Sequence, residues 1–364
     1  MRQEWDAIVV GAGIIGLAVG RELARRGARI AIVDERTATS GATQASAGIL
    51  APHIEASGED ALHRLTTRSL SLYDGFVTGV EQDAGATIEY GRRGTLELAT
   101  TVAAAERLTT LGSTLGRSGV AAEWLDGGDA ARLEPAIAAP IGALFIGAHG
   151  YVRVAQLTAA LIAAARERGA ALLEHRRVER VEPQPGGGVS LTIEGEAHRA
   201  ATVVIAAGSW SGQVAASGPA VAPVRGQLLE LRWRGPAITR VLWSEQCYLV
   251  PWSDGSLLVG ATVEDAGFDQ RTTVDGVRSL MEAASAILPG VGGATFVAAR
   301  AGLRPRSPDG VPFIGRDPRH PGLVYATGHY RNGVLLAPLT AALVADLVLE
   351  DRADPALAIT ALDR

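Results

Sequence analysis

The chain has 364 residues, of which 47% are hydrophobic and 20% charged, and its formal net charge is −5. This length and composition are typical of a globular protein with two domains, and they exclude the basic footprint of a nucleic-acid-binding protein. All 34 basic residues are Arg, which excludes a lysine Schiff base and a lysine phosphate loop. The single cysteine, Cys247, excludes an internal disulfide and favours a cytoplasmic location.

Metal binding and membrane insertion are not expected. The seven histidines show no paired ligand spacing, so we predict no metal site. An apolar run over 7–20 is too short to span a bilayer and contains four glycines. Glu4 and Asp6 precede this run, where a signal peptide carries basic residues. We therefore predict a buried strand and the start of a helix, and no transmembrane segment.

The N-terminal segment has the pattern strand, glycine-rich turn, helix, strand. We predict strands over 6–10 and 28–33, with a helix between them that ends at Arg26 before Gly27. The turn before the helix, Gly11-Ala12-Gly13-Ile14-Ile15-Gly16, matches the GxGxxG pattern. Asp34 follows the second strand, at the distance where an acid holds ribose hydroxyls. This context predicts a dinucleotide site; the alternative is a helix start without a ligand, with Asp34 as a surface acid.

Each glycine of the turn has a separate task in such a site. Gly11 makes the tight turn, Gly13 lets backbone N–H groups approach a pyrophosphate, and Gly16 lets the helix pack on the strand. The helix N-terminus adds partial positive charge. The small residues over 41–50 can run along a pyrophosphate and ribityl chain, which favours FAD over NAD. By composition alone, an ordinary flexible loop is equally compatible.

The rest of the chain alternates predicted strands and helices. We predict a helix over 154–168, stopped by Gly169, and an apolar helix over 334–349 near the end of the chain. A hairpin tip is predicted at 185–188. The predicted strands between these features cover 172–181, 189–193, 202–206, 227–233, 247–251 and 256–262.

Several ordered segments resemble the D-amino-acid oxidase family of flavoenzymes, over about residues 5 to 350. These segments are the N-terminal unit, the loop over 41–52, and the strings at 203–210, 247–251, 302–305, 308–312 and 328–338. The chain is most similar to the branch that oxidises glycine for thiamine biosynthesis. Gln246 and Val263 stand where some members of that branch have His and Met.

The resemblance implies a fold class and an assembly. The fold would be α/β, with a Rossmann-type FAD-binding domain interleaved with an antiparallel-sheet α+β substrate domain. The FAD-binding domain would comprise about 1–82, 145–217 and 298–364, and the substrate domain about 83–144 and 218–297. A homo-oligomer, in the family a tetramer, is also implied, with non-covalent FAD because the 41–52 loop lacks a His and Cys247 lies in a strand.

The resemblance also implies site residues. Arg304, Tyr248, Arg331 and Glu55 would contact the substrate. FAD would contact Gly11, Gly13, Ile14, Ile15, Gly16, Asp34, Glu35, Ala42, Thr43, Ala47, Gly48, Ile49, Val178, Gly208, His329, Tyr330, Arg331, Asn332, Gly333, Val334 and Leu335.

The residues themselves permit this chemistry but leave alternatives open. The planar fork of Arg304 matches a carboxylate, although most arginines are structural or exposed and an ion pair with an acid such as Asp309 would also explain it. Tyr248 could donate to the same carboxylate or could be a core aromatic. The helix that starts near Gly333 could stabilise a reduced flavin through its partial positive charge, or it could be a capped core helix with Arg331 as a surface charge.

The predicted reaction is oxidative deamination of glycine or a similar small amino acid. A hydride passes to flavin, the imino acid hydrolyses to an oxo acid (glyoxylate) and ammonia, and O2 is reduced to H2O2. No residue is predicted as general acid or base. The alternatives are a D-amino-acid or sarcosine oxidase or dehydrogenase, an NAD-dependent dehydrogenase, and a non-catalytic flavin-binding protein.

Overall fold

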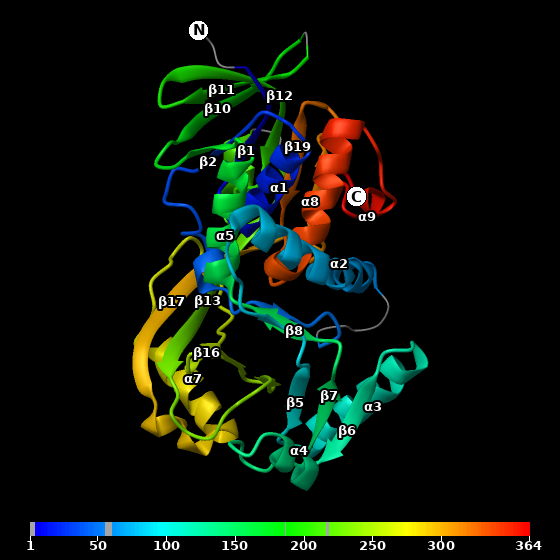
Figure 1. Ribbon diagram of the computed structural model, residues 1–364, viewed down its shortest axis with the longest axis vertical. Helices are drawn as coiled ribbons and strands as arrows, with labels where there is room; N and C mark the ends of the chain where they lie inside the picture. Colours follow the sequence, from blue (N-terminus) through cyan, green and yellow to red (C-terminus); the bar gives the residue numbers. More distant parts are fainter. Residues whose placement is uncertain (1–3, 55–59, 186, 216–217) are drawn as a thin grey trace.

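Two eight-stranded sheets organise the molecule, and they lie toward opposite ends of its long axis (Figure 1). The computed structural model describes residues 4–54, 60–185, 187–215 and 218–364. The helices are α1 (Ile14–Arg25), α2 (Ala61–Ala84), α3 (Val102–Arg117), α4 (Gly127–Leu133), α5 (Val154–Glu167), α6 (Ser211–Val214), α7 (Val274–Ile287), α8 (Gly333–Glu350) and α9 (Ala356–Ile359). Helices α1, α5 and α8 lie with the first sheet, whereas α3, α4 and α7 lie with the second.

The first sheet has a parallel centre, as the βαβ prediction requires. Its strands are β1 (Glu4–Val10), β2 (Ile30–Val33), β9 (Ala171–Leu173), β10 (Val178–Pro183), β11 (Val189–Ile193), β12 (Glu196–Ile205), β18 (Phe313–Arg316) and β19 (Leu323–Thr327). Strand β1 pairs in parallel with β2 and β12, and β2 with β9. Strand β12 also pairs with β11 along its first half and with β19 along its second half.

The second sheet is antiparallel except where β14 meets β5. Its order is β17 (Thr295–Arg306), β13 (Ala222–Arg232), β16 (Ser256–Gly260), β15 (Tyr248–Pro251), β14 (Val241–Trp243), β5 (Thr95–Ala99), β7 (Gly142–Ile146) and β6 (Ala122–Asp126). A small third sheet of β3 (Ile49–Leu50), β8 (Gly150–Val152) and β4 (Tyr90–Gly91) lies between the other two. The predicted α/β fold, with an antiparallel sheet interleaved in the chain, is confirmed.

One predicted strand is wrong. The segment over 172–181 forms two strands, because β9 extends the parallel sheet beside β2 whereas β10 pairs with β11 in a hairpin. Residues 174–177 connect them, and His175 adopts a left-handed conformation there (φ 56°). The backbone N–H of Arg176 donates to the Asp34 carbonyl (2.9 Å), which anchors the turn on the end of β2. The hairpin prediction is confirmed by the β10–β11 pairing, although residue 186 lies outside the described residues.

Helix α8 is apolar and mostly buried, and its interior contains Pro338. Proline has no N–H for the carbonyl four residues earlier. That carbonyl, of Val334, accepts instead from the Tyr73 hydroxyl of α2 (2.9 Å), and Ser69 donates to the next carbonyl, of Leu335 (2.6 Å). By length and composition α8 is the one described helix that could cross a membrane, but 67% of the helix is buried inside the fold. These contacts make it a core helix whose N-terminus is fixed by α2.

Candidate functional site

A long cavity of about 500 Å3 runs between the first sheet and the second. One end is formed by the end of β2, the N-terminus of α1 and Val178 of β10. Its middle is formed by residues 41–52 and the N-terminus of α8. The other end is formed by side chains of the second sheet, from β14, β15 and β17. A cavity of this shape can hold an elongated ligand in contact with both sheets.

The glycine turn brings backbone against backbone. Gly11 has a positive φ (109°), and a Cβ on it would lie closer than 3.0 Å to the carbonyl of Ala206. A Cβ on Gly16 would overlap the carbonyl of Gly11 in the same way. The Asp34 carboxylate accepts from the backbone N–H of Ala12 (2.8 Å), so it braces the turn directly. The N-cap residue of α1 is Gly13, which has no side chain, and the positive end of the helix is directed at the cavity.

The small-residue loop is ordered by contacts with its neighbours. Gly48 has φ 73°, and its carbonyl accepts from the backbone N–H of Val152 in β8 (2.9 Å). A Cβ on Gly48 would overlap the Val152 carbonyl, so only glycine permits this approach. Thr43 accepts from the Ile14 N–H at the start of α1 (3.1 Å). The loop therefore lines the cavity in a fixed conformation.

Two long side chains reach the far end of the cavity from different strands. Arg304 comes from β17, and its Nη1 donates to the carbonyl of Thr262 (2.9 Å). Tyr248 comes from β15, and its ring lies 5.1 Å from that of Trp243. The proposed ion pair of Arg304 with Asp309 is wrong, because Asp309 pairs with Arg364 (2.8 Å) and that guanidinium lowers the pKa of the Asp309 carboxyl to about 2.

Cys247 takes no part in this surface. Its thiol is buried in the core on the opposite side of the strand from Tyr248, as the alternation of side chains along a strand predicts. Burial raises the pKa of the thiol to about 11, which removes its nucleophilic form at neutral pH.

The turn before α8 is conformationally unusual. Tyr330 has φ 48°, a conformation that a bulky residue rarely adopts, and its N–H donates to the Pro305 carbonyl (2.8 Å). His329 is buried and contacts the Thr340 hydroxyl (3.0 Å), and desolvation lowers its pKa to about 3. His329 is therefore a neutral packing group at neutral pH. Arg331 lies at the exposed margin of the cavity, with its guanidinium 5.8 Å from the Tyr330 ring.

This geometry can be compared with known proteins. The model of the DAO family of FAD-dependent oxidoreductases matches residues 6–347. The chain belongs to this family. It is 38% identical to the glycine oxidase of Geobacillus kaustophilus over 96% of this chain and 94% of that one, and 33% identical to the glycine oxidase of Bacillus licheniformis with the same coverage. The crystal structure of the G. kaustophilus enzyme superposes with a TM-score of 0.95 at 36% identity, covering 100% of this chain and 99% of that one.

FAD is thus the cofactor of this oxidoreductase, and the residues present fit it. The start of α1, whose N-cap residue Gly13 has no side chain, and the closely packed Gly11 and Gly16 suit a pyrophosphate. The small residues of the 41–52 loop, which line the cavity, leave room for the remainder of an extended dinucleotide. The cavity connects both features without interruption, which a mononucleotide would not need.

Most of the residues predicted for the site line this one cavity. They are Gly11, Gly13, Ile14, Ile15, Asp34, Glu35, Ala42, Thr43, Ala47, Gly48, Ile49, Val178, Gly208, Tyr248, Arg304, His329, Tyr330, Arg331, Asn332, Gly333, Val334 and Leu335. Gly16 is not part of the lining, because it packs beneath the turn against Gly11. Glu55 lies outside the described residues.

Sequence reasoning missed several aromatic and cationic groups of the lining. The guanidinium of Arg36 lies 4.4 Å from the centre of the Trp210 ring, and both residues line the cavity. Trp243 lines the opposite end beside Tyr248. The position of Arg36 directly after Asp34 and Glu35 was a usable signal, but the stacking partner is 174 residues away and no local pattern indicates it.

A row of three histidines also went unpredicted. His63 lines the cavity, and its Nε2 lies 2.8 Å from Nδ1 of His53, whose ring stacks on His149 (5.2 Å between ring centres). Desolvation, with a smaller contribution from His63, lowers the pKa of His53 to about 4, and burial lowers the pKa of His149 well below its usual value. The inner two rings are therefore neutral at neutral pH. Their positions at 53, 63 and 149 gave no spacing signal.

Proposed function

We propose that this chain is an FAD-dependent amino-acid oxidase whose substrate is glycine or a similar small amino acid. The observation that carries the proposal is the pair of Arg304 and Tyr248 at the end of the cavity remote from the glycine turn. A guanidinium fork matches a carboxylate in two parallel hydrogen bonds, and a phenol can add a third. The glycine oxidase relatives, at 38% and 33% identity over nearly the whole chain, support the same substrate.

The protein's contribution to the reaction is mainly placement. When bound, FAD supplies the two-electron acceptor for the hydride of the α-carbon and passes the electrons to O2, giving H2O2. Arg304 and Tyr248 would hold the carboxylate, so that the α-carbon and its neutral amine face the middle of the cavity. The N-terminus of α8 would supply partial positive charge there. The imine product hydrolyses to glyoxylate and ammonia. No described side chain is assigned as general acid or base.

The cofactor contacts are proposed from the same lining. The turn over 11–16 and the start of α1 would hold the pyrophosphate, Asp34 and Glu35 the ribose, and residues 42–49 with 329–335 the flavin portion. Arg36 and Trp210 extend the ribose end as a stacked pair. We propose that FAD is held without a covalent bond, so acid precipitation should leave the yellow colour in the supernatant. Colour retained in the precipitate would contradict this.

The proposal extends to domain limits and context. The FAD-binding domain would comprise about 1–82, 145–217 and 298–364 and the substrate domain the remainder, with β17 crossing the limit near 298.

A homo-oligomer in the cytoplasm, and supply of the imine for thiamine thiazole synthesis, complete the proposed role. The latter is supported by the bifunctional protein ThiO/ThiG of a Nostoc species, 33% identical over 97% of this chain and 54% of that protein.

A panel of substrates tests the function. The purified protein is mixed anaerobically with glycine, sarcosine or small D-amino acids, and loss of flavin absorbance near ~450 nm is followed. Glycine should reduce the flavin fastest at low concentration, and readmitted air should return the colour with formation of peroxide. Faster reduction by sarcosine or a D-amino acid would assign the chain to that alternative within the family. Reduction by none of them would contradict the proposal.

A further inference from the structure

The guanidinium of Arg304 lies against the backbone of the neighbouring strand at Gly226. Strands β13 and β17 pair so that Gly226 stands opposite Gly302 and Val224 opposite Arg304. A Cβ built on Gly226 would meet three atoms of the Arg304 guanidinium, all closer than 3.0 Å. Gly226 has no positive φ that would require glycine. What requires glycine here is therefore the space that the guanidinium occupies.

The Arg304 guanidinium also contacts the carbonyl of Thr262, which accepts from its Nη1 (2.9 Å). We call the space bordered by Gly226 and this carbonyl the seat of Arg304. The segment that carries this carbonyl continues from β16 alongside β13. The N–H of Thr262 donates to the Gln227 carbonyl (3.2 Å), and Arg225 and Glu264 exchange both backbone hydrogen bonds (2.9 Å each). The Thr262 carbonyl is thus held in position by the strand that also provides Gly226.

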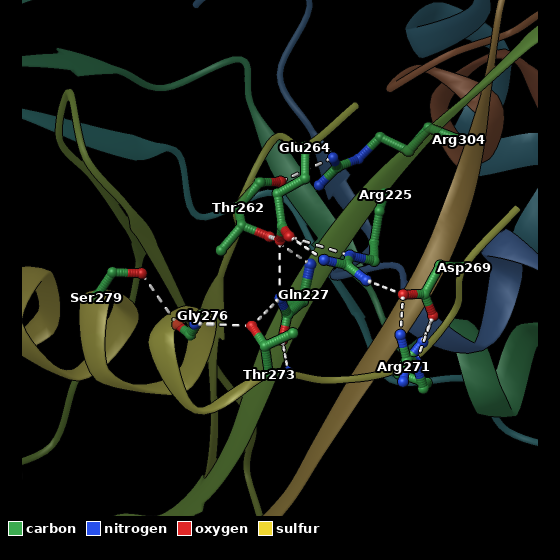
Figure 2. A network of polar contacts seen from close by, with 10 residues as sticks. All are labelled: Arg225, Gln227, Thr262, Glu264, Asp269, Arg271, Thr273, Gly276, Ser279 and Arg304. Atoms are coloured by element: carbon green, nitrogen blue, oxygen red, sulfur yellow. Dashed lines mark hydrogen bonds and ion pairs between the residues drawn. The ribbon is translucent and has the colours of Figure 1, made fainter. Parts of the chain in front are cut away.

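The Glu264 carboxylate fastens this segment from the side away from Arg304 (Figure 2). One of its oxygens accepts from the Gln227 amide (2.8 Å) and from the Thr262 hydroxyl, and the other accepts from Nε of Arg225 (3.0 Å). Partial burial opposes ionisation of Glu264, but these hydrogen bonds and the Arg225 charge prevail and lower its pKa. Arg225 is buried and also pairs with Asp269 (3.1 Å). The carboxylate therefore stays ionised and holds three neighbours at once.

We propose that Gly226 is a specificity-determining residue, because its missing side chain gives the Arg304 guanidinium the seat from which it meets a substrate carboxylate. Glu264 is a positioning residue for the same seat and acts through Thr262. This inference rests on the proposed function, which assigns the carboxylate to Arg304. It adds that the selectivity for carboxylate substrates depends on a strand that contributes no polar side chain to the cavity.

The test is Gly226→Ala. The atoms that the new methyl group meets are the end of a flexible side chain, so the variant should fold and retain FAD while the guanidinium moves. The glycine concentration for half-maximal anaerobic flavin reduction should rise about tenfold or more, a shift of one decade or ~1.4 kcal/mol. The limiting rate at saturation should change much less. Binding of acetate, a carboxylate without an amine, read from the flavin absorbance, should weaken by the same factor.

Two controls isolate the effect. Gly292→Ala adds the same methyl group into open space and should change neither glycine nor acetate binding. In an Arg304→Ala background, Gly226→Ala should add almost nothing, since the seat then has no occupant. Full additivity of the two changes, or unchanged glycine and acetate binding in Gly226→Ala, would overturn the inference.

Two further results separate this inference from the function on which it rests. If Arg304→Ala alone left glycine and acetate binding unchanged, the carboxylate site itself would be wrong, and the seat with it. If Gly226→Ala does not retain FAD, Glu264→Gln serves as the test variant instead, because this change adds no volume. It should raise the half-saturating glycine concentration about threefold or more at an unchanged limiting rate. No rise in that variant would overturn the inference.

Discussion

The two ends of the cavity use glycine in opposite ways. At the cofactor end, Gly11 and Gly16 let backbone approach backbone, and the crowding atoms are the carbonyls of Ala206 and Gly11. At the substrate end, Gly226 and Gly260 let backbone approach side chains, which are Arg304 and Tyr248. Carbonyls within a turn cannot move aside, whereas the ends of long side chains can. Substitutions at the first end should therefore remove the folded holoenzyme, and those at the second should alter substrate selection while the fold persists.

The largest effect is expected from Gly16→Ala in α1. The new Cβ would overlap the Gly11 carbonyl, so the turn must open, at a cost of roughly 3 kcal/mol or more. The purified protein should contain little FAD and should melt at a lower temperature. The matched control is Gly75→Ala in α2, where a Cβ meets nothing within 4 Å. It should keep FAD and gain up to about 1 kcal/mol of stability. If purified Gly16→Ala contained a full complement of FAD, the proposed difference between glycines at the two ends of the cavity would be contradicted.

The second effect concerns acid and the row of buried histidines that follows the 41–52 loop. The pKa of His53 is lowered to about 4, so between about pH 6.5 and pH 4 the unfolded chain binds a proton that the folded chain does not. Stability should therefore fall as the pH falls through this window, by roughly 2–3 kcal/mol for this group. The drop in melting temperature from pH 7 to pH 4.5 should be smaller in His53→Gln than in the wild type. A change at the exposed His175 should leave the drop unaltered, and equal drops in all three proteins would contradict the assignment.

A smaller effect is expected from Asp34→Ala. The carboxylate braces the turn through the Ala12 N–H, and the proposal also gives it the ribose hydroxyls. Its removal should weaken FAD binding by roughly 1–3 kcal/mol, the cost of leaving such groups unpaired. The limiting rate with saturating FAD and glycine should change little. Titration of apoprotein with FAD measures the loss. A larger loss in Glu35→Ala would transfer the ribose contact to that neighbour, and unchanged affinity in both variants would contradict the placement.

The smallest effect is expected at Gly260, which lies beneath the Tyr248 ring in the paired strand. Gly260→Ala should displace the ring and weaken glycine binding by about 1 kcal/mol, the contribution of one neutral hydrogen bond. Tyr248→Phe should produce a loss of similar size, and the two changes together should cost no more than either alone. Half-saturation of flavin reduction by glycine is the measurement. Additive losses would show that Gly260 does not act through Tyr248.

The same contrast explains what the sequence could predict. The glycine turn, Asp34 and the strand–helix–strand pattern lie within 30 consecutive residues, so rules of local sequence predicted them. Gly11, Gly13 and Asp34 of this unit line the long cavity. The split between β9 and β10 was missed because the two strands lie only four residues apart and have different partners, although the polar residues 174–177 between them were a local signal. The seat of Arg304 combines Gly226 of β13 with Thr262 and Glu264 of the segment after β16, and no spacing within the chain indicates that they meet. The histidine row was missed for the same reason.

The central claim is that Arg304 holds the substrate carboxylate, and one comparison tests it most directly. Anaerobic flavin reduction is measured with glycine and with ethylamine, which has no carboxylate, in the wild type, Arg304→Ala and Arg304→Lys. In Arg304→Ala, the glycine concentration for half-maximal flavin reduction should rise by two to four decades, because leaving a buried partner unpaired costs roughly 3–5 kcal/mol. The concentration of ethylamine for half-maximal reduction should be unchanged. Arg304→Lys should rescue poorly, because an ammonium lacks the planar fork. An equal loss for both substrates, or no loss for glycine, would contradict the account.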